Sequence, residues 1–157
     1  MKHTISVLVE NKPGVLARVA GLFSARGYNI ASLAVSETLD PEISYMTIVV
    51  QAEDEKILEQ IKKQLNKLID VISVTDFTKK EHVEKELILL KIAYTAKDKG
   101  KVEALVNKYS GELIKHKEGV AIISIVEEQA KIKQALEALS QFEIKELVRT
   151  GKIAIAF

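Results

Sequence analysis

Hydrophobic positions in the first half of the chain switch between the period of a strand and that of a helix. Residues 3–10 are rich in β-branched side chains and place an apolar residue at every second position, which predicts a strand. From Val15 the apolar positions recur at helical spacing until Arg26-Gly27, where glycine accepts the left-handed turn that ends a helix. The pattern further predicts strands at 28–38 and 43–51, a helix whose apolar stripe covers 57–69, and a strand at 71–77.

The same order of elements returns after a polar stretch, TKKEHVE, at residues 78–84. The second half predicts a strand at 85–95, a helix at 102–109, a hairpin of 113–117 and 120–126, a helix at 132–139 and a strand at 144–148, followed by a last apolar run at 153–157. We therefore expect a first domain at 1–78, a linker at 79–84 and a second domain at 85–157. Two β-α-β-β-α-β units indicate an α+β protein built from two ferredoxin-like domains.

One face of each predicted sheet has no helix to cover it. A domain of about 75 residues buries only about 60% of the surface of its unfolded chain, so it gains little stability alone. An uncovered sheet face and open strand edges favour symmetric pairing with another copy. We expect a homodimer or a larger assembly.

Composition excludes several classes of protein. The chain has 157 residues, with 23 Lys and Arg against 22 Asp and Glu, a balance that argues against a binder of nucleic acid or of a membrane surface. It has no cysteine, which excludes a disulfide scaffold, a thiolate metal site and a cysteine nucleophile. No apolar run approaches the roughly 20 residues of a membrane span, and the start lacks a signal-peptide stretch. We expect a cytoplasmic protein.

The loop between the first strand and the first helix is the main candidate for chemistry. Pro13 suits the first turn of a helix, and Asn11 can cap that helix or reach a ligand. Gly14 lets a guest approach the backbone, and the free N–H groups of the first turn favour a small carboxylate. A tight strand-to-helix turn explains the same residues and is the commoner case for such a loop taken alone.

A second candidate is Asn29, where the first helix passes into the second strand. Its side chain offers two donors and an acceptor, close to a sheet edge that a partner chain could reach. A solvated amide after a glycine-terminated helix is the simpler interpretation of this residue by itself.

Taken together, these residues resemble the opening of ACT domains, ferredoxin-like modules that bind free amino acids between paired domains. The stretches SVLVENKPGVLARVAGLFSARGYNIASL, SYMTIVV and ILEQIKKQLNKLIDVISVTDF are similar to the small regulatory subunits of acetolactate (acetohydroxyacid) synthase. The resemblance is strong over residues 4–78. It is weaker in the second, ACT-like domain, where Leu90-Lys91-Ile92 and Arg149-Thr150-Gly151 match in type and place.

The resemblance implies a non-catalytic regulatory subunit in the biosynthesis of valine, isoleucine and leucine. Such a chain activates a large catalytic subunit, which carries thiamine diphosphate and Mg²⁺, and confers feedback inhibition by valine or another branched-chain amino acid. No cofactor or metal is expected in this chain. The residues that the resemblance assigns to the amino-acid effector are Asn11, Pro13, Gly14, Val15 and Leu16, with Asn29 and Ile30 from the facing chain. Pro13 departs from the small polar residue of many members and is expected to stiffen the loop.

Two other classes of function compete with this one. A free-standing amino-acid sensor could act on another protein or on transcription, but the chain has neither a helix-turn-helix pattern nor a basic stripe. An enzyme on the same framework would need paired acids or a nucleophile with its base, and neither is evident. The three histidines lack the spacing of a metal site; they are His3, His82 and His116.

Overall fold

The computed structural model describes all 157 residues, which form two compact units. Residues 1–83 and 152–157 make up unit 1, and residues 84–151 make up unit 2. The last six residues, which the sequence pattern assigned to the second domain, thus belong with the first. A short apolar run can pair with either unit, and local periodicity does not decide between them.

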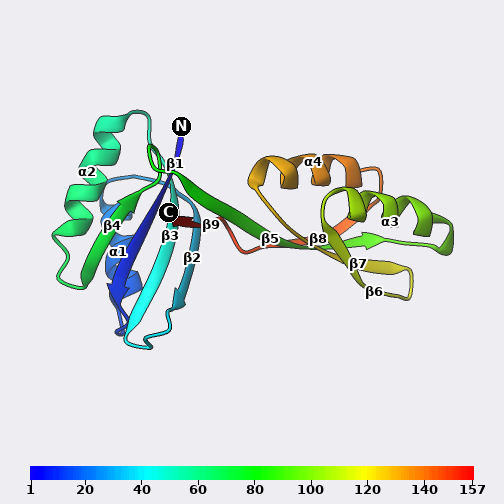
Figure 1. The fold of residues 1–157 in the computed structure, drawn as a ribbon, viewed down its shortest axis with the longest axis horizontal. Coiled ribbons are helices and arrows are strands. Elements are labelled where there is room, and N and C mark those ends of the chain that lie inside the picture. Colours follow the sequence, from blue (N-terminus) through cyan, green and yellow to red (C-terminus); the bar gives the residue numbers. More distant parts are fainter. The chain divides into compact units, whose positions relative to one another are not determined.

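Unit 1 is a four-stranded antiparallel sheet with both helices on one face (Figure 1). Its elements are β1 (Lys2–Glu10), α1 (Val15–Ala25), β2 (Ile30–Glu37), β3 (Ile43–Gln51), α2 (Glu55–Asn66) and β4 (Val71–Asp76), with strand order β2-β3-β1-β4. Alternate residues of β1, among them Ile5 and Val7, are buried against Phe23 of α1 and Ile61 of α2. The apolar residues that alternate along the strands and those that recur along the helices therefore pack together in one core.

Unit 2 repeats the design of unit 1. Its elements are β5 (His82–Ala93), a 3₁₀ turn η1 (Ala96–Asp98), α3 (Lys99–Lys108), β6 (Gly111–Lys117), β7 (Val120–Glu127), α4 (Gln129–Leu139) and β8 (Ile144–Arg149). The strand order β6-β7-β5-β8 corresponds strand for strand to that of unit 1. The α+β class with two ferredoxin-like units is confirmed. No helix has the length and apolar composition that a bilayer span needs.

The chain ends in a short strand, β9 (Ile153–Ala156), which lies on unit 1 (Figure 1). Tyr45 Oη donates to the Ala154 carbonyl at 2.7 Å, and the Lys152 amide donates to Ser32 Oγ at 3.1 Å. Tyr45 alternates along β3 with the core residue Met46, so it points away from the helices. β9 therefore covers part of the sheet face that the sequence pattern left open.

Two buried carboxylates of unit 2 lie opposite each other in the β5–β7 ladder, on Glu86 and Glu127. Arg149 donates to Glu86 from Nε at 2.7 Å and from Nη2 at 3.0 Å. Lys85 Nζ donates to Glu127 at 3.0 Å, and Lys131 Nζ lies 3.6 Å from the same carboxylate. The hydrogen bond from Lys85 lowers the pKa of Glu127, although burial opposes this shift. Each buried negative charge is thus compensated.

We expect this arrangement to make unit 2 less stable in acid. A carboxyl with a lower pKa in the folded chain stabilises it above its unfolded pKa of about 4.3, and this contribution disappears as the pH falls through the folded pKa. Glu127→Gln should lower the urea midpoint at pH 7, and its difference from the parent should shrink below about pH 4. Glu128→Gln, at an exposed neighbour, is the control. If the difference in urea midpoint between Glu127→Gln and the parent does not change with pH, the lowered pKa of Glu127 is contradicted.

Candidate functional site

The loop between β1 and α1 is held by the turn that joins β2 to β3. Asn11 Nδ2 donates to the Pro41 carbonyl at 2.8 Å, and the Asn11 backbone amide donates to the Glu42 carbonyl at 2.7 Å. The Asn11 side chain therefore does not cap α1, and the prediction that it could do so is wrong. Its Oδ1 accepts no hydrogen bond within the chain, so the exposed amide presents an acceptor to a ligand.

The N-terminus of helix α1 has no side-chain cap. Gly14 is the N-cap residue and has φ +85°, in the left-handed region where glycine carries no Cβ strain. Pro13 precedes the N-cap and does not occupy the first turn, contrary to the sequence prediction. No side chain caps the helix, and the amides of Leu16 and Ala17 have no acceptor in the chain. Two N–H groups at the positive end of the helix dipole thus remain available.

Charged side chains of both signs surround this end of the helix. Arg18 Nε donates to Asp70 at 2.8 Å, and Lys12 Nζ lies 2.8 Å from the Glu10 carboxylate. The hydrogen bond to Glu10 raises the pKa of Lys12. A ligand that carries both an ammonium and a carboxylate suits such mixed surroundings better than a phosphate does.

The apolar members of the predicted site differ in what they can offer a ligand. Val15 is 3% exposed and packs into the core of unit 1, so only its backbone is available. Leu16 is 45% exposed beside it. Ile30, at the start of β2, is partly buried against the same core. Leu16 is therefore the apolar side chain that this loop presents to a ligand.

Asn11 and Asn29 lie at opposite ends of the sheet of unit 1. Glu10, next to Asn11, is paired with Ile43 at the start of β3, whereas Ile30, next to Asn29, is paired with Val50 near its end. The seven steps from Ile43 to Val50 span about 24 Å at about 3.4 Å per residue. The structure thus brings together the predicted site residues from 11 to 16 and separates them from residues 29 and 30. One chain cannot place both asparagines on one small ligand.

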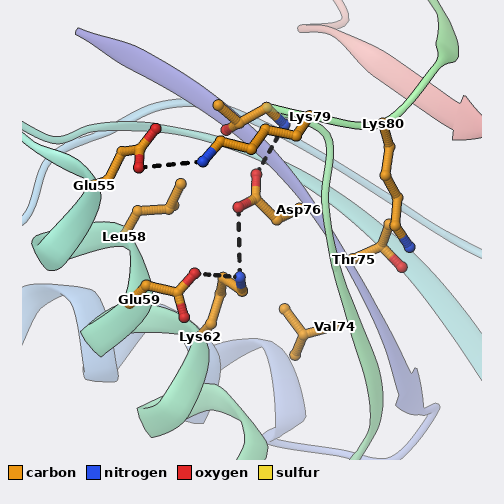
Figure 2. A pocket seen from close by; sticks show the side chains of 10 residues that line it. Glu55, Leu58, Glu59, Lys62, Val74, Thr75, Asp76, Lys79 and Lys80 are labelled. Carbon is orange, nitrogen blue, oxygen red and sulfur yellow. Dashed lines mark hydrogen bonds and ion pairs between the residues drawn. The ribbon is translucent and has the colours of Figure 1, made fainter.

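A pocket of about 310 Å³ lies between α2 and β4, and Figure 2 shows the side chains that line it. Most of its charges are paired with one another: Lys62 with Glu59 at 2.6 Å and Asp76 at 3.5 Å, and Lys79 with Glu55 at 3.3 Å. Sequence reasoning did not identify this pocket, because its residues look like a solvated helix face until α2 and β4 are placed side by side.

This pocket is separate from the loop at Asn11. Asp76 is in register with Ile5 near the start of β1, whereas Asn11 follows the end of that strand. No three His, Asp or Glu side chains of the chain are grouped closely enough to hold a metal ion. The loop at Asn11 remains the better candidate, because it combines unpaired backbone donors with charges of both signs.

A βαββαβ unit with an open helix start after its first strand has the architecture of an ACT domain. Residues 5–73 match the family model described as "AHAS small subunit-like ACT domain". Residues 85–157 match the model described as "Small subunit of acetolactate synthase". The chain belongs to the family of acetolactate synthase small subunits, and the resemblance seen in the sequence is confirmed.

Individual relatives agree along almost the whole chain. The "Probable acetolactate synthase small subunit" of Archaeoglobus fulgidus is 46% identical over 99% of this chain and 96% of its own length. The "Acetolactate synthase small subunit" of Mycobacterium bovis is 44% identical, covering 98% of this chain and 91% of its own. The crystal structure of the small subunit from Thermotoga maritima superposes with a TM-score of 0.89 at 37% identity, covering 100% of this chain and 98% of that chain. This membership supports the role of a regulatory subunit.

Proposed function

We propose that this chain binds an acetolactate synthase catalytic subunit, raises its activity and makes it sensitive to feedback inhibition by valine or another branched-chain amino acid. Family membership along both units supports the choice of partner. The observation that carries the effector site is the start of α1, where the amides of Leu16 and Ala17 lack an acceptor. Thiamine diphosphate and Mg²⁺ belong to the catalytic partner in this proposal.

In the effector site that we propose, different groups of the protein bind the carboxylate, the ammonium group and the side chain of the amino acid. The α-carboxylate accepts hydrogen bonds from the open amides at the start of α1, where the helix dipole favours a negative charge. The ammonium group donates to Asn11 Oδ1, which has no other donor in the chain. Leu16 packs against the aliphatic side chain.

Pairing of two β2 strands would complete this site. β2 is an edge strand of the unit 1 sheet, and two-fold pairing of two copies runs antiparallel, so the start of one strand meets the end of the other. The end of β2, Glu37, pairs with Ser44 and so lies at the Asn11 end of the sheet. Such pairing carries Asn29 and Ile30 of the partner subunit towards Asn11 and produces two equivalent sites.

The expected oligomer is a dimer or larger at micromolar concentration. Sedimentation velocity of the purified chain, with and without L-valine, measures its mass and any change on binding. Titration of leucine and isoleucine in the same experiment ranks the effectors. A monomer that still binds the amino acid would contradict the shared site.

Inhibition in this proposal is transmitted between proteins. A chain without an active site alters catalysis only by binding the conformations of the catalytic subunit unequally. An effector held between two regulatory chains changes their relative orientation with few new contacts, and couplings of about 1–3 kcal/mol are typical. Reconstitution with purified catalytic subunit tests the proposal: pyruvate consumption should rise on adding this chain and fall on adding valine. No change in activity on adding this chain would refute it.

A further inference from the structure

The side chain of Arg18 reaches back along α1 to Gly14 at the candidate site. Long side chains on a helix lean towards its N-terminus, and Arg18 lies in the first turn of α1. A Cβ built on Gly14 would lie 2.9 Å from Arg18 Nη1. The guanidinium group therefore occupies the space that a side chain would need at position 14, the N-cap of the helix whose Leu16 and Ala17 amides are open.

Asp70 fixes the orientation of this guanidinium group. Its carboxylate accepts from Arg18 Nε at 2.8 Å, and its backbone carbonyl accepts from the Glu10 amide at 2.9 Å, which ties Asp70 to the end of β1. The Asp70 side chain is 10% exposed, whereas the Arg18 side chain is 49% exposed. Neither Nη1 nor Nη2 of Arg18 donates a hydrogen bond within the chain. The two terminal nitrogens thus form an unused edge, the geometry that binds a carboxylate through two parallel hydrogen bonds.

We propose that Arg18 binds the α-carboxylate of the amino-acid effector and that Asp70 is its positioning residue. This inference rests on the proposed function and adds a binding residue to the same site. Arg18 and the amides at the start of α1 then face one anion, so the site selects an α-amino monocarboxylate over a neutral amide of the same shape. Glycine at position 14 is needed for this arrangement, because a Cβ would displace the guanidinium group.

The test measures binding of two probes, L-valine and L-valinamide, to the full-length chain by calorimetry. Arg18→Gln should weaken binding of L-valine by about tenfold or more, since a hydrogen-bonded charge partner is lost, and should leave binding of L-valinamide nearly unchanged. Arg18→Lys keeps the charge without the paired donors and should recover part of the loss. Arg26→Gln is the matched control, because Arg26 follows the other end of α1 and bonds to Gln64 at 2.8 Å.

The outcomes separate this inference from the proposed function. Arg18→Gln binding valine like the parent overturns the role of Arg18 alone, and the proposed effector site survives. Equal weakening of both probes, with a lower unfolding temperature and no rescue by Arg18→Lys, assigns Arg18 a structural role only and also overturns the inference. A parent chain that binds no branched-chain amino acid refutes the proposed function and the inference with it. If Arg18→Gln weakens the binding of valine but not of valinamide, the inference is supported. If valinamide binds the parent too weakly to measure, weaker binding of valine by Arg18→Gln at an unchanged unfolding temperature supports it as well.

Discussion

Gly14→Asp is expected to lower the affinity for valine by about 100-fold or more. The new Cβ meets the Arg18 guanidinium group, and the new carboxylate places a like charge beside the carboxylate of the effector. Asp is one of the few residues other than glycine that enter the left-handed region, so the cost in stability should stay near 1 kcal/mol. Calorimetric titration with L-valine measures the affinity, and urea unfolding measures the stability.

Gly21→Asp is the control for this prediction. Gly21 lies in α1, is exposed, and has no atom within 4 Å of a Cβ built on it. The same side chain is thus added to the same helix without entering the site, and valine should bind as it does to the parent. If Gly14→Asp also binds like the parent, the effector site lies elsewhere.

Asn29→Ala is expected to weaken inhibition by valine about tenfold or more, while the chain still activates the catalytic subunit. The Asn29 side chain makes no hydrogen bond within the chain, and its backbone carbonyl, which accepts from the Gln51 amide at 3.1 Å, is kept by alanine. The fold of unit 1 should therefore be unchanged. Loss of one ligand contact weakens effector binding without altering the surfaces that bind the catalytic subunit.

Reconstitution assays measure activation of the catalytic subunit without valine and its inhibition with valine. The valine concentration for half-inhibition should rise about tenfold or more, which corresponds to one lost polar contact in a desolvated site. Asn66→Ala, at an exposed amide at the end of α2, is the control. Should Asn29→Ala abolish activation and inhibition together in a folded chain, the two functions share one surface and their separation is wrong.

Most of the fold could be predicted because the spacing of apolar residues within each element distinguishes a strand from a helix. The strand predicted at 43–51 is found at those residues. The helix predicted after it is α2, which Asp54 caps by accepting from the Ile57 amide at 2.9 Å. The residues of β9 were identified from the sequence only as a last apolar run. Their attachment to unit 1 was not predicted, because it depends on Tyr45, which lies 109 residues from Ala154.

The candidate site was predicted less completely, since its geometry depends on register and on distant partners. The sequence left open whether Asn11 caps α1 or reaches a ligand, and the cap is excluded because its amide donates to the Pro41 carbonyl in the β2–β3 turn. The separation of Asn11 from Asn29 follows from strand pairing, which local sequence does not show. Arg18 was not singled out, because its partner Asp70 lies 52 residues away and a charge on a helix surface is usually solvated.

The central claim is that each effector site takes Asn11 from one chain and Asn29 from the other. Co-expression of an Asn11→Ala chain with an Asn29→Ala chain, each with a different tag, allows the hybrid dimer to be purified. In the hybrid, one site carries both substitutions and the other carries none. Neither homodimer should bind valine with parental affinity, whereas the hybrid should bind one valine per dimer with parental affinity. A hybrid that binds no better than the two homodimers would contradict the account.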